Sequence, residues 1–196
     1  MTNNIINIKC AIIGAGGIGS YLVEHIDRLI DLNQINNITF TVYDNDIVEK
    51  KNMLYQNFLP SDIDMNKVEA LSLRFFNIKF INKRVDISTL SKYDLVILCA
   101  DNNKIRKDTW LNWTTNKINF IDSRANGRAI GLYSNNTDNY VKTLSDDDSP
   151  TSCQNPFQIS NKEIEFGNVC VASILTQSIL NYSRKHTLPN DLVLHL

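Results

Sequence analysis

A glycine-rich loop at residues 14–19 constrains this chain more than any other feature. The loop reads GAGGIG, follows the apolar run of residues 11–13 and opens a helix-length segment. In such a unit Gly14 permits the tight turn, Gly16 lets the backbone approach a phosphate, and Gly19 allows close packing of helix on strand. The N–H groups at the start of the helix also carry partial positive charge. The loop therefore predicts a nucleotide site, with an unliganded strand–turn–helix unit as the alternative.

The spacing of apolar residues predicts an α/β fold. Residues 94–100 form a nearly continuous apolar run, typical of a parallel strand buried on both faces. We expect further strands at residues 9–13, 38–43, 80–81, 118–122 and 129–133, and helices at 19–32, 67–76, 102–116 and 169–182. Together they predict one domain, 1–196, with a Rossmann-like, doubly wound sheet that is mostly parallel and has antiparallel strands toward the C-terminal half. The strand at 129–133 is expected at the sheet edge, and residues 134–166 as a long polar loop.

Two acidic residues directly follow predicted strands. Asp44 comes after the strand at 38–43, and Asp101 comes after the apolar run at 94–100. Because ligands of an open parallel sheet bind beyond the carboxyl ends of its strands, we expect both carboxylates to face one site. Asp44 is placed to accept hydrogen bonds from a ribose.

Composition excludes several other classes of protein. The formal net charge of -1 argues against a nucleic-acid partner. No apolar run approaches the roughly 20 residues of a membrane span, and residues 1–4 do not begin a signal peptide, so we expect a cytoplasmic location. The four cysteines form no C-x-x-C pair, so no structural zinc is expected. Cys10, Cys99 and Cys170 are predicted to be buried, whereas Cys153 lies in a polar stretch.

Several spaced motifs resemble those of the ThiF/MoeB/HesA family. Residues 44–56 are similar to the family segment D-x-D-x-V-x-x-x-N-x-x-R-Q, and residues 61–67 to a D-I-G-x-x-K-like run. Residues 99–106 are similar to C-x-D-N-x-x-x-R, so the resemblance covers roughly residues 8–133. Residues 147–153 are similar to the D-x-x-T-P-S-C segment of small ThiF-like proteins.

The resemblance implies that the chain binds Mg-ATP and adenylates the C-terminal carboxylate of a small β-grasp, ubiquitin-like or sulfur-carrier protein or peptide. It also implies a homodimer, or a heterodimer with a related subunit. The implied ATP-binding residues are Gly14, Gly16, Gly17, Gly19, Asp44, Asp46, Asn52, Gln56 and Lys67. Lys67 would offset charge on the leaving group, and Asp101 would hold Mg²⁺ through a carboxylate oxygen.

The chain also departs from the family pattern. The arginine before the glutamine is Tyr55 here, and a tyrosine brings no positive charge. Only about eight residues precede the first predicted strand, so the N-terminal helix that supplies a further arginine in some members is expected to be absent. Lys50, Lys51 and Arg106 are the candidates to replace the missing charge.

Three functions therefore stay open. The first is the adenylating enzyme, and the second is a non-catalytic ThiF-like subunit or scaffold that needs a partner. The third is an NAD-dependent oxidoreductase, which would explain Asp44 but leaves Lys67 and Asp101 without a purpose. Cys153 is a candidate acyl acceptor, with an unreactive loop cysteine as the alternative, because no histidine lies near it in sequence.

Overall fold

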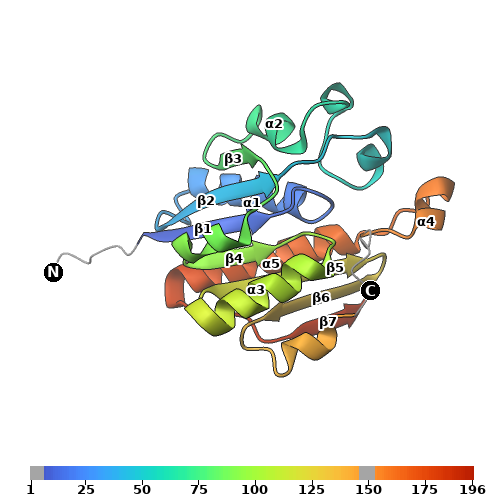
Figure 1. Cartoon of the computed structure of the whole chain (residues 1–196). Helices are drawn as coiled ribbons and strands as arrows, with labels where there is room; N and C mark the ends of the chain where they lie inside the picture. The colour runs from blue at the N-terminus through green and yellow to red at the C-terminus, as the bar shows by residue number, and fades with distance from the viewer. Residues whose placement is uncertain (1–6, 146–152) are drawn as a thin grey trace.

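The computed structural model describes residues 7–145 and 153–196, and its described part is built on a seven-stranded sheet (Figure 1). The spatial order is β3-β2-β1-β4-β5-β6-β7. The strands are β1 (Ile8–Ile13), β2 (Ile38–Asp44), β3 (Lys79–Asn82), β4 (Leu95–Leu98), β5 (Asn119–Asn126), β6 (Ala129–Ser134) and β7 (Leu192–His195). The α-helices are α1 (Gly19–Asp31), α2 (Lys67–Ser72), α3 (Asn103–Asn116), α4 (Pro156–Asn161) and α5 (Gly167–Lys185). Short 3-10 helices are η1 (Lys50–Leu54), η2 (Pro60–Asp62), η3 (Ile87–Lys92) and η4 (Tyr140–Thr143).

The strand pairing changes from parallel to antiparallel along the sheet. Pairing is parallel across the first five strands of the spatial order, from β3 to β5. Pairing is antiparallel between β5 and β6 and between β6 and β7. This arrangement confirms the predicted Rossmann-like sheet with antiparallel strands toward the C-terminal half. Because the parallel strands share one direction, their carboxyl ends meet at one edge, where the glycine loop also lies.

Helices cover both faces of the sheet. On one face α1, α2 and α5 pack against alternate strand residues, among them Ile12, Val42 and Ile97, and α1 and α5 are in contact. On the other face α3 and η3 cover Val96, Leu98 and other residues of opposite parity (Figure 1). Since strand side chains alternate between faces, this pattern buries β1 and β4 on both sides. The burial of β4 was predicted from its continuous apolar sequence.

The structure corrects the predicted end of one helix, the predicted position of one strand and the predicted character of one loop. The helix predicted at 67–76 ends at Ser72, and the chain beyond it is held by Asn77, whose backbone N–H donates to Asp27 Oδ1 (3.0 Å). The strand at 129–134 is not at the sheet edge, because β7 pairs outside it. The predicted polar loop at 134–166 contains η4 and α4, and Tyr140 of η4 is fully buried. The acidic run at 146–148 and the family-like segment up to residue 152 lie outside the described residues.

Candidate nucleotide-binding site

A cavity of about 290 Å³ opens at the carboxyl ends of β1, β2 and β4. Its lining includes Gly14, Gly16, Gly17, Asp44, Asp46, Tyr55, Gln56, Lys67, Lys83, Arg84, Asp101 and Cys153. These residues come from segments that are distant in sequence. The sheet edge therefore gathers most of the polar residues singled out above into one concave site.

The glycine loop has the geometry that a phosphate-binding turn needs. Gly14 has φ +99°, and a Cβ there would lie 2.9 Å from the Cys99 carbonyl. Gly19 packs against the Gly14 carbonyl so closely that any side chain would overlap it. At Gly16 the nearest atom to a Cβ would be Gln56 Nε2 at 4.0 Å, so this backbone is open to the cavity. The tight turn at Gly14 and the close packing at Gly19 are thus as predicted, and the open backbone at Gly16 leaves the space that a phosphate would need.

Two carboxylates and one lysine are tied to this loop. Asp44 Oδ2 accepts the Ala15 N–H at 2.7 Å, and Asp44 Oδ1 accepts the Asp46 N–H at 2.8 Å. Lys67 Nζ donates to Asp46 Oδ2 at 3.0 Å. Only 9% of the Lys67 side chain is exposed, so its charge faces the cavity rather than bulk water. The lysine is therefore positioned by the second aspartate of the D-x-D motif.

Asp101 follows β4 and lines the same cavity. Burial raises the pKa of the Asp101 carboxyl, and the charge of Asp46 adds to this effect, while Lys67 and Arg106 oppose it. A partly buried carboxylate of this kind gains stability when a cation binds beside it. Within residues 7–145 and 153–196, no group of three or more His, Cys, Asp or Glu residues could hold a metal alone. One carboxylate still fits Mg²⁺, which commonly takes one or two carboxylates plus phosphate oxygens and water.

A second cavity of about 320 Å³ lies over β5, β6 and β7. It shares Cys99, Ala100, Asp101 and Cys153 with the first, so the two cavities meet beside Asp101. Its lining includes the small residues Ala129 and Gly131. Two adjoining cavities can hold two reactants side by side.

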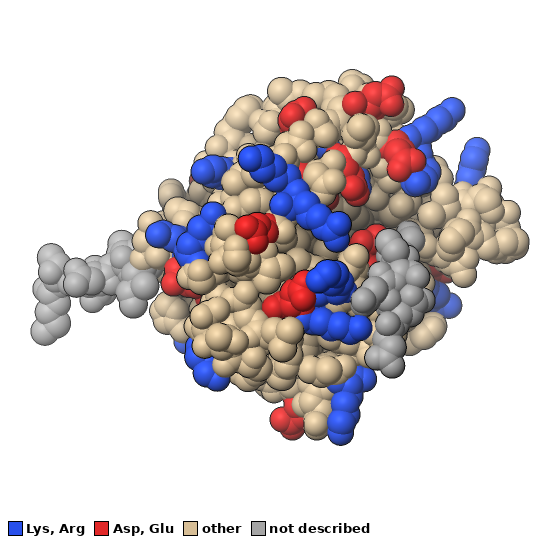
Figure 2. Space-filling model, viewed as in Figure 1, with Lys and Arg blue, Asp and Glu red and all other residues tan. Residues whose placement is uncertain are grey.

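Figure 2 shows lysine and arginine interspersed with acidic residues on the face that it presents, without a continuous basic surface.

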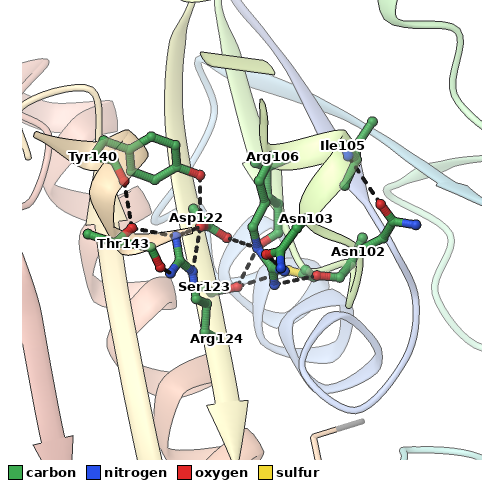
Figure 3. Close-up of polar contacts among 12 residues, drawn as sticks. Asn102, Asn103, Ile105, Arg106, Asp122, Ser123, Arg124, Tyr140 and Thr143 are labelled. Atoms are coloured by element: carbon green, nitrogen blue, oxygen red, sulfur yellow. Dashed lines mark hydrogen bonds and ion pairs between the residues drawn. The ribbon is translucent and has the colours of Figure 1, made fainter. Parts of the chain in front are cut away.

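A buried polar network lies beside the second cavity, which two of its residues, Arg106 and Arg124, line (Figure 3). Asp122, with 0% exposure, accepts from Arg106 Nε at Oδ1 (3.0 Å) and from Arg124 Nε at Oδ2 (2.8 Å). Tyr140 Oη donates to the same Oδ2 at 2.9 Å. Arg106 Nη2 also donates to the Ala100 carbonyl at 2.7 Å, which fixes the backbone just before Asp101. Arg106 is thus engaged in structural contacts, which argues against it as the substitute for the family arginine.

The model of the ThiF family matches residues 2–193. The chain belongs to the ThiF family. It is 28% identical over 144 residues to the ATP-dependent ubiquitin transferase-like protein Cap2 of Enterobacter hormaechei subsp. hoffmannii (strain UCI 50), a match that covers 67% of this chain and 23% of Cap2.

Solved structures share the fold of this ThiF-family chain. E. coli MccB, crystallised with ATP, superposes with a TM-score of 0.65 at 18% identity, over 98% of this chain and 61% of MccB. PaaA superposes with a TM-score of 0.68 at 17% identity, over 96% of this chain and 61% of PaaA. The chain therefore spans less than two thirds of the relatives that it matches.

Of the polar residues that the resemblance implies for ATP binding in this ThiF-family chain, Asp44, Asp46, Gln56 and Lys67 line the first cavity. Asn52 is buried and does not line the cavity formed by the described residues; its Oδ1 accepts the Glu49 N–H at 2.7 Å and caps η1. Its observed contribution is to shape the segment that carries Tyr55 and Gln56, and its direct phosphate contact stays a prediction. Gly19 likewise supports the loop from behind. Lys51, another candidate for the missing charge, pairs with Glu49 at 2.9 Å on the surface.

Cys153 lies between the glycine loop and the second cavity. A Cβ at Gly17 would be 3.2 Å from its Sγ, and burial raises the pKa of the thiol to about 11. A thiol with this pKa is protonated near neutral pH and is a poor nucleophile without a base. The position suits an acyl acceptor, whereas the chemistry favours an unreactive thiol.

Several residues of the site carry no signal in the sequence. Lys83 and Arg84 follow β3 and line the first cavity, yet in the sequence they look like an ordinary surface pair. Asp122 and Arg124 belong to a strand whose visible pattern is apolar, and their pairing depends on β5 lying between β4 and β6.

None of the helices in residues 7–145 and 153–196 is both long and apolar enough to cross a membrane.

Proposed function

We propose that this chain binds Mg-ATP in the first cavity and adenylates the C-terminal carboxylate of a small ubiquitin-like, β-grasp protein or peptide. The observation that carries the proposal is that Lys67 and Asp101, from separate elements, line the same cavity as the glycine loop. An NAD site would need the loop and Asp44 but neither of these two residues. Membership of the ThiF family and the likeness in fold to MccB, which has been crystallised with ATP, support the same choice.

In the proposed reaction a carboxylate oxygen of the acceptor attacks the α-phosphorus of ATP. An acyl–phosphate bond forms, the bond from the α-phosphorus to the bridging oxygen breaks, and pyrophosphate leaves with the electron pair. Lys67 would offset the negative charge that develops on the leaving group, and Asp101 would hold Mg²⁺. The bound Mg²⁺ would supply further charge neutralisation at the phosphates. Such a reaction depends on positioning and electrostatics more than on a general acid or base.

We further propose that the acceptor carboxylate reaches the α-phosphate through the second cavity. The two cavities share Asp101, so a tail lying over β5 and β6 would end beside the nucleotide. Ala129 contributes a small side chain to the lining, whereas the space beside Gly131 is filled by the Tyr133 ring, 2.7 Å from where a Cβ at Gly131 would lie. Cap2 is described as ubiquitin transferase-like, and MccB has been crystallised with MccA, which supports a protein or peptide as the acceptor. A cytoplasmic location remains our expectation.

Tyr55 favours a second candidate, a ThiF-like subunit that needs a related partner. This tyrosine is buried and lines the cavity at the position of the family arginine. A second protomer of the same chain or of a related subunit would then have to supply a cation. We propose the dimer on this ground.

Thermal unfolding with ligands tests the proposal. A ligand at about 100 times its Kd stabilises a protein by roughly 2.7 kcal/mol, which raises the Tm of a chain of this size by several degrees. We expect a Mg²⁺-dependent shift with ATP and none with NAD, and a smaller ATP shift for Lys67→Ala. Lys185→Ala, at the exposed end of α5, is the matched control and should behave as wild type. A shift with NAD alone would refute the proposal, and ATP binding without pyrophosphate exchange in the presence of candidate acceptors would favour the partner-dependent subunit.

A further inference from the structure

Asn168, the second residue of α5, connects two segments that line the nucleotide cavity. The residue is 1% exposed, and its Nδ2 donates to the Gly17 carbonyl at 2.9 Å and to the Tyr55 carbonyl at 2.8 Å. Both amide hydrogens are therefore used, one on each segment. Because Gly17 belongs to the glycine loop and Tyr55 to the segment after η1, this one side chain links both segments to α5.

The oxygen of the same amide reaches a third segment. Asn168 Oδ1 accepts from Gln154 Nε2 at 3.3 Å, and Gln154 Oε1 accepts the Glu165 N–H at 3.1 Å. Gln154 follows Cys153, which lines both cavities. Since Asn168 faces two carbonyls with its nitrogen and an amide N–H with its oxygen, only one orientation of the side chain satisfies all three contacts.

These contacts lie directly behind the place where phosphates would bind. Gly16 and Gly17 line the cavity from the glycine loop, and Tyr55 and Gln56 line it from the other segment. Gln56 Oε1 is buried and has no hydrogen-bond partner within the described residues. The distance between the two segments sets the width of the cavity, and small misplacements of binding groups weaken phosphate recognition strongly.

We propose that Asn168 is a positioning residue that fixes the width of the nucleotide cavity by holding the glycine loop and the Tyr55–Gln56 segment at a set separation. The inference rests on the proposed function, because it assumes that nucleotide phosphates bind between these two segments. It predicts that the side chain of Asn168 affects binding of phosphate-bearing ligands although it touches none of them. Substitution of a residue that only stabilised the fold would change the affinities for ATP and for adenosine equally.

The test compares Asn168→Asp with Asn37→Asp. Aspartate has the shape of asparagine but no N–H donors, so in Asn168→Asp carboxylate oxygens face the Gly17 and Tyr55 carbonyls. Asn37 is the matched control, because its Nδ2 also donates to a backbone carbonyl, that of Ser183 at 2.8 Å, and it lies before β2, at the opposite end of the sheet. Asn168→Asp replaces two donated hydrogen bonds by repulsion and Asn37→Asp replaces one, and only the first does so beside the cavity.

Two measurements decide the outcome. By calorimetric titration, Asn168→Asp should raise the Kd for Mg-ATP about tenfold or more and leave the Kd for adenosine within about twofold, from the loss of two positioned hydrogen bonds. By hydrogen exchange of the ligand-free protein, peptides covering residues 14–19 and 52–58 should both exchange faster in Asn168→Asp and be unchanged in Asn37→Asp. An unchanged Kd for ATP, or an equal loss of ATP and adenosine binding, overturns the inference.

Failure of the proposed function gives a different result. If wild type binds no ATP, the nucleotide assignment is wrong, and the exchange experiment still shows whether Asn168 holds both segments. If exchange then rises in only one of the two peptides, or in neither, the positioning role is overturned as well. Asn168→Ala, which removes the donors without adding repulsion, should lie between wild type and Asn168→Asp in both measurements.

Discussion

Replacing Asp122 by asparagine should strongly destabilise this protein. The carboxylate is fully buried and accepts from Arg106, Arg124 and Tyr140 (Figure 3). Two guanidinium groups share this single negative charge, so the intact cluster already has an excess of one positive charge. In Asp122→Asn the cluster has an excess of two positive charges. The new amide N–H groups also point at an N–H or O–H donor of at least one of the three partners.

The expected magnitude follows from the burial of the partners. The Arg106 side chain is 5% exposed, so water can hardly replace the lost carboxylate there, whereas that of Arg124 is 21% exposed and partly reachable by water. Removing one partner of a buried ion pair typically costs about 3–5 kcal/mol. For a chain of this size each 1 kcal/mol lowers the Tm by about 2–4 °C, so the expected decrease is roughly 6–20 °C.

Urea unfolding followed by circular dichroism measures this effect. Asp108→Asn is the matched control: Asp108 pairs with Lys104 at 2.9 Å one turn away on α3, where such a pair contributes about 0.5 kcal/mol or less. The double variant Asp122→Asn/Arg124→Met removes one of the two excess charges and should recover part of the stability. A loss below about 1 kcal/mol for Asp122→Asn, or no recovery in the double variant, would refute the reasoning.

Three further predictions concern the cavity itself. The double variant Lys83→Ala/Arg84→Ala should weaken binding of ATP more than binding of AMP in calorimetric titrations, because it removes two cations from a cavity lining that holds three carboxylates. Equal losses of affinity for the two nucleotides would contradict this prediction. Burial raises the pKa of Asp101 in the folded protein. The protonated carboxyl therefore contributes to the free energy of unfolding below the unfolded-state pKa of about 3.9, and this contribution is lost as the pH rises through the folded-state pKa. Asp101→Asn should therefore raise the Tm of the ligand-free protein at about pH 7, raise it less at about pH 4, and abolish the Mg²⁺ dependence of ATP binding; a lower Tm at pH 7 would show that the sign is wrong. Cys153, whose pKa burial raises to about 11, should be alkylated by iodoacetamide at about pH 8 at least about tenfold more slowly than a free cysteine, as followed by mass spectrometry; rapid labelling would indicate an activated thiolate.

Local sequence patterns were sufficient for the parallel half of the fold and for the centre of the site. The glycine loop depends on steric effects between neighbouring residues, so its spacing already specifies the turn at Gly14 and the close packing at Gly19. Asp44 ends a strand with alternating apolar residues and Asp101 follows a continuous apolar run, and parallel strands bring their carboxyl ends to one edge. Both residues line the cavity as the sequence predicted.

The antiparallel half and the supporting residues were decided by tertiary contacts. Asn52 looks like a phosphate ligand in the family pattern, but it caps η1 because the chain turns there. The burial of Tyr140, the pairing of Asp122 with two arginines, and the position of β7 depend on strand order and register. Asn168 meets Gly17 and Tyr55 only after α5 has packed beside α1.

The division has a physical cause. Backbone sterics and hydrophobic periodicity act over a few residues and can be read from the chain itself, so the sequence determined the turn, the buried strands and the acidic residues that follow them. A buried amide or ion pair gains its stability from partners that only the packed chain brings within hydrogen-bond distance. The tertiary structure therefore decided which polar side chains surround and support the first cavity.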